Sequence, residues 1–234
     1  HIAGEYKITP NTDVLDEITL GASGRLYTPK SQGTVFKDTG NVVITNSEVG
    51  FYAGAQKKFG RNYIVSATFR VDKNENFNVL VTPAASFVWS PDPQNYFRFS
   101  FSGGIRNPTL SDQYLNLDVG RATLLGNLDG FNDLITVESF ETYLGSLMRV
   151  DLDSFDVAPV KPEKVKTFEV GYRTTLFDAL YIDGSYYYSI YDDFIGYNLG
   201  IQTEFTVFNT PLNTEAYRVS ANSENTVTTQ GLAI

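Results

Sequence analysis

Alternation between apolar and polar residues is the feature that most restricts the fold of this chain. In the stretch YFRFSFSG, residues 96–103, every second residue from Phe97 to Phe101 is phenylalanine, and Arg98 and Ser100 stand between them. A period of two is typical of a β-strand with one apolar face. The pattern predicts nine strands, at residues 2–9, 17–27, 47–59, 62–72, 78–90, 95–105, 167–177, 180–191 and 226–234.

Charged residues separate the two faces of the expected strands. Twelve of them lie opposite the apolar face, and only Lys57, beside an expected turn, shares it. The twelve are Glu5, Lys7, Glu17, Arg25, Glu48, Lys58, Arg70, Asp72, Arg98, Glu169, Arg173 and Asp183. A soluble β-sandwich also alternates, but on a membrane barrel an outward Arg or Lys at mid-membrane would cost about 2–4 kcal/mol. The separation of charge therefore fits an apolar face that contacts lipid.

Strand length and the pattern of connections favour the barrel. The expected strands have about 8–13 residues, longer than the usual length of about 5–6 and close to the roughly 9–11 that cross a bilayer at a tilt. Short links at 10–16, 60–61, 91–94 and 178–179 alternate with longer connections at 28–46, 73–77, 106–166 and 192–225. We therefore predict an all-β fold, an antiparallel transmembrane β-barrel.

The ends of the chain lead to the expectation that it is a fragment of a larger barrel. It begins inside the first expected strand and stops inside the ninth. Bacterial single-chain barrels usually have an even number of strands, and an open sheet would leave unpaired edges in lipid. We expect one partial β-barrel domain over residues 1–234, with long extracellular loops near 28–46, 106–166 and 192–225.

Composition and motifs give no indication of catalysis, of a cofactor or of nucleic-acid binding. The net charge is −9, so no basic surface is expected for phosphates, and the chain has no cysteine and one histidine. The acidic runs DLDSFD (151–156) and NLDGFND (127–133) lack the full pattern of a calcium loop. We favour solvated acidic loops over calcium sites there, and expect no catalytic residue, cofactor, metal site or nucleic-acid partner.

Three segments carry a resemblance to a known family. They are FRFSFSGGIRNPTLSDQY (97–114), VKPEKVKTFEVGYRTTLF (160–177) and YIDGSYYYSIYDDFIGY (181–197). They resemble the later part of the β-barrel of TonB-dependent outer-membrane receptors, particularly those of Bacteroidota-type bacteria. DEITLGASGRLYTP (16–29) and RVDKNENF (70–77) are similar to such barrels as well.

The resemblance implies a barrel of about 22 strands with a plugged lumen, of which this chain would supply about nine. It implies a location in the bacterial outer membrane and energy-coupled uptake of a nutrient ligand: a siderophore, cobalamin, a glycan or a peptide. Outer-membrane lipid and the TonB energy-coupling complex would be partners, the latter through a plug domain that is not in this chain. A lipoprotein lid is a further partner that such bacteria can supply.

The long loops hold the residues that we expect to contact a ligand or a partner. Residues 106–163 carry ten acids and four bases, and a connection of this length usually has a function or internal structure. The candidates are Asp112, Tyr114, Asp129, Phe131, Asp151, Asp153 and Tyr197. A charged cap that keeps the rim soluble is the alternative interpretation of this segment.

Two other functions stay open from the sequence. One is a passive porin or an adhesin-type outer-membrane barrel, in which a barrel strand would follow the signal peptide directly. The other is a soluble β-sandwich that binds carbohydrate, which would be recovered in buffer without detergent. We expect no enzyme activity in any of these cases.

Overall fold

The larger sheet contains all nine strands that the alternation predicts. The computed structural model describes residues 1–11, 13–177 and 179–234, and within them this sheet has nine strands, antiparallel throughout, in the order β1-β2-β3-β4-β5-β6-β11-β12-β15. They are β1 (Ile2–Ile8), β2 (Glu17–Tyr27), β3 (Asn46–Phe59), β4 (Tyr63–Asn74), β5 (Leu80–Asp92), β6 (Asn95–Arg106), β11 (Glu163–Leu176), β12 (Leu180–Asp192) and β15 (Val227–Ala233). The largest difference from the prediction is at β11, which begins at Glu163 rather than at residue 167.

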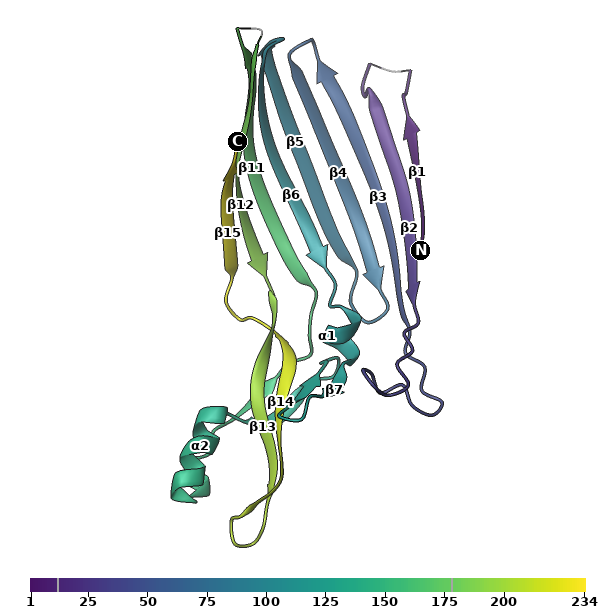
Figure 1. Cartoon of the computed structure of the whole chain (residues 1–234). Coiled ribbons are helices and arrows are strands. Elements are labelled where there is room, and N and C mark those ends of the chain that lie inside the picture. Colours follow the sequence, from purple (N-terminus) through teal and green to yellow (C-terminus); the bar gives the residue numbers. More distant parts are fainter. Residues whose placement is uncertain (12, 178) are drawn as a thin grey trace.

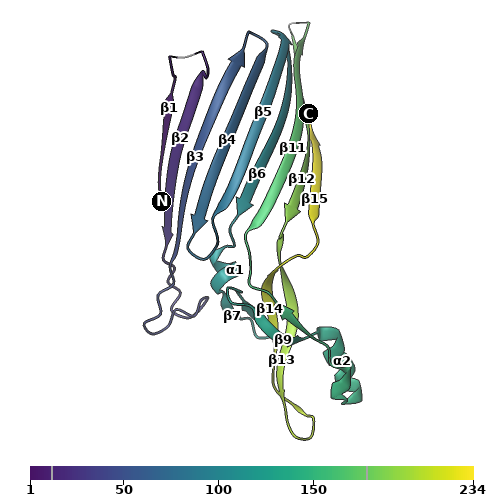
Figure 2. The same cartoon turned by 180° about the vertical axis from the view of Figure 1, so that it is seen from behind.

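The strands stand side by side as a curved, tilted wall (Figure 1), which Figure 2 shows from behind. Short links join them at one end, which we call the turn side, and the longer connections lie at the other, the loop side. Thr12 and Asp178, in the links expected at 10–16 and 178–179, lie outside the described residues. The antiparallel wall with alternating short and long connections agrees with the predicted fold class.

The apolar face of the wall is exposed and continuous. Phe99 lies directly opposite Phe87 and Val170 on the neighbouring strands, and Phe99 and Val170 are 44% and 49% exposed. One row in register across six strands consists of Val65, Phe87, Phe99, Val170, Tyr186 and Leu232. An apolar surface of this extent requires an apolar environment, and hydrocarbon supplies it. Lys57 is on this face, but its Nζ reaches the turn side, where it donates to the carbonyl of Asp13 at 2.6 Å.

A row of aromatic rings marks the turn side of the apolar face. Its members are Phe59, Tyr63, Trp89, Phe97 and Tyr172, in register on five neighbouring strands. The rings of Trp89 and Phe97 are 5.0 Å apart between centroids, and those of Phe97 and Tyr172 are 4.7 Å apart. Such rows are typical of the membrane interface, where one end of Tyr or Trp is apolar and the other contacts water.

Polar side chains cover the opposite face of the wall and bind one another across strands. The Arg98 guanidinium lies 2.6 Å from the Glu169 carboxylate, and the hydroxyls of Ser66 and Ser86 are 2.7 Å apart. Gly171 leaves room for Arg98 to lie flat, because a Cβ there would be 3.2 Å from the guanidinium. These contacts give the charged residues partners on the side away from lipid.

The two longest connections form a second sheet on the loop side. Among the described residues it has six strands, in the order β10-β9-β13-β14-β8-β7. They are β7 (Asn116–Asp118), β8 (Thr123–Leu125), β9 (Phe131–Ile135), β10 (Ser154–Val157), β13 (Ile195–Phe205) and β14 (Pro211–Asn222). Helix α1 (Leu110–Tyr114), helix α2 (Val137–Ser146) and the 3₁₀ turn η1 (Arg149–Asp151) flank it. The sequence predicted these segments only as loops.

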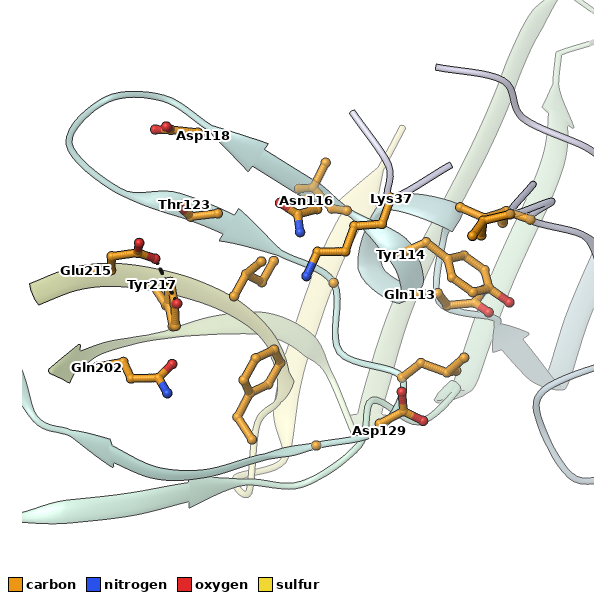
Figure 3. Close-up of a pocket in the computed structure, with 18 of the residues that line it drawn as sticks. Lys37, Gln113, Tyr114, Asn116, Asp118, Thr123, Asp129, Gln202, Glu215 and Tyr217 are labelled. Atoms are coloured by element: carbon orange, nitrogen blue, oxygen red, sulfur yellow. Dashed lines mark hydrogen bonds between the residues drawn. The ribbon is translucent and has the colours of Figure 1, made fainter. Parts of the chain in front are cut away.

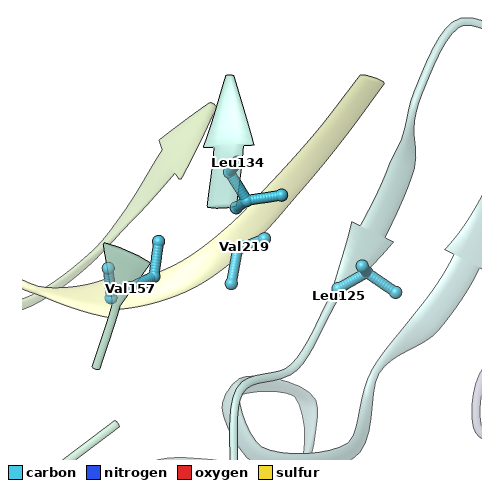
Figure 4. Packing of buried hydrophobic residues seen from close by; sticks show 5 residues of the cluster. Leu125, Leu134, Val157 and Val219 are labelled. Carbon is cyan, nitrogen blue, oxygen red and sulfur yellow. The ribbon is translucent and has the colours of Figure 1, made fainter. Parts of the chain in front are cut away.

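A small apolar core holds this second sheet together (Figure 4). Leu125, Leu134, Val157, Val219 and Ala221 are buried against one another, and they come from β8, β9, β10 and β14. The core therefore joins residues that are far apart in the sequence. In the described part of the chain, neither helix has the length and apolarity that a membrane span requires.

Candidate ligand-binding pocket

An open pocket lies on the loop side, between the link from β2 to β3 and the second sheet (Figure 3). Its volume is about 1020 Å³, at the upper end of the range of roughly 300–1,000 Å³ that ligand sites occupy. Lys37 and residues 42–45 line one side, α1 with β7, β8, Gly126 and residues 128–131 line another, and Gln202, Glu215 and Tyr217 reach it from β13 and β14. The pocket therefore collects side chains from segments distant in sequence.

Acidic side chains predominate among the charged residues of the pocket. The described lining includes four acids, Glu75, Asp118, Asp129 and Glu215, and one base, Lys37. The hydroxyl of Tyr217 donates to Glu215 at 2.8 Å, and partial burial together with this bond raises the pKa of Tyr217. The rings of Tyr114, Phe131 and Tyr217 also line the cavity.

Buried amides place Tyr114 at the pocket. Gln113, only 3% exposed, accepts from Asn46 at 3.0 Å and from Asn76 at 2.7 Å, and donates to the carbonyl of Pro108 at 2.7 Å. The Asn76 amide also donates to the Tyr114 hydroxyl at 2.6 Å. Helix α1 is thereby fixed to the loop-side ends of β3 and β4.

Asn127 joins four segments behind the pocket. Its side chain is fully buried, and its amide donates to the carbonyls of Ala158 and Ser220 at 2.8 and 2.9 Å. Its side-chain oxygen accepts from the amide of Gly130 at 2.9 Å. The backbone N–H of Asn127 donates to the carbonyl of Asp112. Asn127 therefore has a structural role, because its buried side chain holds the segments around Ala158, Ser220 and Gly130 together.

Two of the segments that carry the family resemblance, 97–114 and 160–177, meet at an ion pair. Arg106 and Glu163 lie opposite each other in register, with the guanidinium 2.7 Å from the carboxylate. Glu163 is 5% exposed and also accepts from the backbone N–H of Ile195 at 3.1 Å. The pair therefore joins β6, β11 and β13 at the point where the wall meets the second sheet.

We expect Glu163→Gln to lower the free energy of unfolding by about 1–2 kcal/mol, because it removes a charge-assisted bond in a nearly buried place. Glu169→Gln is the matched control, since its ion pair with Arg98 is similar in distance but more exposed, and we expect less than about 1 kcal/mol there. Urea titration of the protein in lipid vesicles measures both. Equal losses would contradict the structural role of Glu163.

The loop that carries Lys37 is organised by the carboxylate of Asp38. This carboxylate accepts from the hydroxyl and the backbone N–H of Ser31 and from the backbone N–H groups of Gln32 and Gly33. Gly33 has φ of 81°, which favours glycine. The bonds from Ser31, followed by that from Gly33, hold the pKa of Asp38 well below its usual value.

This lowered pKa predicts a pH dependence of the loop. The folded loop favours the ionised carboxylate of Asp38. The contribution of Asp38 to the stability of the loop is therefore complete above its ordinary pKa of about 4, and it is lost as the pH falls further toward the lowered pKa of the folded state. Protection factors for amide hydrogen exchange at residues 31–36, which are corrected for the intrinsic pH dependence of exchange, should stay constant from pH 7 to about 5 and fall below about 4. Asp38→Asn should show little protection at every pH. Strong protection in that variant would show that the carboxylate is not required.

The structure brings three of the expected ligand-contact residues together. Tyr114, Asp129 and Phe131 all line the pocket. The other four lie elsewhere: Asp112 caps α1 through Thr109, Asp151 accepts from the hydroxyl of Ser146, the Asp153 carbonyl accepts from the N–H of Thr136, and Tyr197 lies under the Arg218 guanidinium. Their contact with a ligand stays a prediction.

Several lining residues were not singled out from the sequence. Lys37, Glu75, Gln202, Glu215 and Tyr217 reach the pocket from three other connections. Of these three connections, only 192–225 has acids and aromatics that suggest ligand contact in the sequence, and the pattern does not show which of its positions reach the pocket. Within the described ranges, no group of three or more His, Asp or Glu side chains is arranged to hold a metal ion.

Comparison with solved structures shows the same fold in bacterial siderophore and hemophore receptors. The siderophore receptor PirA of Pseudomonas aeruginosa has a TM-score of 0.67 at 12% identity, over 98% of this chain and 37% of PirA. A double mutant of the Serratia marcescens hemophore receptor HasR, in complex with its hemophore HasA and heme, has a TM-score of 0.67 at 10% identity, over 98% of this chain and 37% of HasR. A variant of the ferric enterobactin receptor PfeA of P. aeruginosa, in complex with enterobactin, has a TM-score of 0.66 at 11% identity, over 98% and 32%. The chain thus spans about a third of the length of these receptors.

Sequence comparison identifies the family. A search of the curated proteins gave no match. The family model described as "TonB dependent receptor-like, beta-barrel" matches residues 5–233, which is nearly the whole chain. The chain therefore belongs to the TonB-dependent receptor-like β-barrel family, and its nine-stranded wall is part of a larger barrel of that kind.

Proposed function

We propose that this chain is part of a receptor in the bacterial outer membrane that takes up a nutrient ligand by energy-coupled transport. The observation that supports this best is a pocket of about 1020 Å³ on the loop side of a wall whose apolar face suits lipid. The loop side would face the cell exterior, because outer-membrane barrels have long extracellular loops and short periplasmic turns. Family membership supports the same function.

The pocket is the proposed ligand site, with Tyr114, Asp129 and Phe131 in contact with the ligand. Siderophores, cobalamin, glycans and peptides are the ligand classes considered. Energy would come from the TonB complex acting on a plug domain, and outer-membrane lipid would surround the wall. A lipoprotein partner could cover the loop side.

Uptake by cells that express the intact receptor tests this function. The probes are a labelled ferric siderophore, cobalamin, an oligosaccharide and a peptide. We expect uptake of one of them to cease when the proton-motive force is collapsed, while binding persists. A passive porin would continue uptake, and an adhesin would bind without uptake.

A pocket-filling variant locates the site. Thr123 lines the pocket, and Thr123→Trp should reduce uptake at least 10-fold by occupying the space of the ligand. Thr142, exposed on α2, does not line the pocket, and Thr142→Trp is the matched control. Uptake unaffected by Thr123→Trp would exclude this pocket as the ligand site.

A further inference from the structure

We propose that the pocket takes a cationic organic ligand, one that presents primary amines or guanidinium groups. This inference rests on the proposed function of the pocket as the ligand site of the receptor. Three observations carry it: the excess of acids over bases in the lining, the aromatic rings beside them, and the distribution of charge over the whole chain.

The acids of the pocket come from separate places in the chain. Glu75 belongs to the connection between β4 and β5, Asp118 ends β7, Asp129 precedes β9, and Glu215 lies on β14. The fold therefore gathers negative charge around the cavity from four segments. These carboxylates would repel an anionic ligand, and among the described lining residues only Lys37 would attract it.

Two charged groups of the pocket have no partner within the described residues. Asp129 and Lys37 make no hydrogen bond or ion pair through their side chains there, whereas Glu215 is bound by Tyr217 and Glu75 by Ser47. Figure 3 shows Lys37 extending toward the cavity and Asp129 at its lower rim. An amine of a ligand would gain a partner in Asp129 and would be repelled by Lys37.

Aromatic rings stand among these acids. Tyr114, Phe131 and Tyr217 line the same cavity. An ammonium or guanidinium group is attracted to the face of such a ring, most strongly where water is excluded. Carboxylates together with rings therefore favour organic cations over both anions and purely apolar ligands.

The net negative charge of the chain lies on the loop side. The connections between the wall strands there, residues 28–45, 75–79, 107–162 and 193–226, together hold 15 of the 27 acids and 6 of the 18 bases, which accounts for the whole net charge of −9. The rest of the chain is balanced, with 12 acids and 12 bases. A negative field on the side where ligands arrive raises the local concentration of cations and lowers that of anions.

Two labelled hexapeptides test the inference on the intact receptor in detergent. One alternates lysine with glycine, the other glutamate with glycine. We expect the lysine peptide to bind at least 10-fold more tightly at low salt, and the preference to shrink as salt is raised. Asp129→Asn should weaken its binding about 3-fold, and Lys37→Gln should strengthen it by a similar factor. These opposite changes distinguish a local charge effect from damage to the fold.

Glu141 provides the matched control, because it is exposed on α2 and does not line the pocket. Glu141→Gln removes the same charge and should leave peptide binding within 1.5-fold or so of the wild type. Equal binding of the two peptides, binding of neither, or weaker binding of the lysine peptide to Lys37→Gln would overturn the inference. The uptake experiment with Thr123→Trp is independent of these results, so a wrong charge class and a wrong site give different outcomes.

Discussion

Replacement of Phe99 by arginine is expected to destabilise the barrel wall by about 1–3 kcal/mol, because it places a guanidinium on the lipid face, between the aromatic row and mid-membrane. Phe99 is the centre of the apolar row, opposite Phe87 and Val170. The loss should appear as a lower urea midpoint in lipid vesicles and as less folded receptor in the outer membrane. Folded barrels are counted by their faster migration in unheated gels.

Ser102→Arg is the control for this change. Ser102 lies on the same strand, three residues closer to the loop side, but on the polar face, where it is opposite Thr167. We expect a change within about 0.5 kcal/mol, as for surface substitutions. A loss as large as that of Phe99→Arg would mean that the apolar face does not contact lipid.

Asn127→Leu is expected to unfold the second sheet while the wall stays intact. The leucine leaves the carbonyls of Ala158 and Ser220 and the amide of Gly130 without their partner in a fully buried place. Each orphaned group costs about 1–3 kcal/mol, so the total should exceed about 3 kcal/mol. Faster hydrogen exchange and proteolysis within residues 106–162, with unchanged gel migration of the barrel, would show this.

Asn132→Leu makes the same substitution on β9, where the side chain is exposed. It should leave exchange and proteolysis unchanged. If Asn127→Leu has no larger effect than Asn132→Leu, the second sheet is held by its apolar core, and the bonds of Asn127 are dispensable.

The wall was predictable because its rules are local. A strand that crosses a membrane must alternate over its whole length, so each strand could be identified without knowledge of its neighbours. The exception, Lys57, is explained by the same physics, since its long side chain reaches the polar turn side. The later start of β11 in the prediction arose because Lys164 and Lys166 on the apolar parity interrupt the pattern; these lysines lie near Asp193 and Asp192.

The second sheet was not predictable in the same way. Strands such as β7 and β8 have only three residues, too few for a period to be recognised. β8 pairs in parallel with β14, with Leu124 opposite Arg218, so the contact spans a large part of the chain. Tyr114, Asp129 and Phe131 belong to the long acidic connection 106–163, which the sequence marked as a candidate for ligand contact. Lys37 and Glu215 reach the pocket from other connections, and only the distant pairings bring them there. Arg106 and Glu163 lie in two separate segments of the family resemblance, and only the register shows that they pair.

The aromatic row on the turn side has a mechanical consequence. Energy-coupled uptake of the proposed kind would apply a pull from the periplasm, and the wall would have to keep its depth in the membrane while that force acts. A shift in one direction would carry the polar tips of Trp89 and Tyr172 into hydrocarbon, and a shift in the other would bring the bodies of their rings into water. The row of rings would therefore resist displacement along the membrane normal, at the rim that would face the periplasm in the proposed orientation.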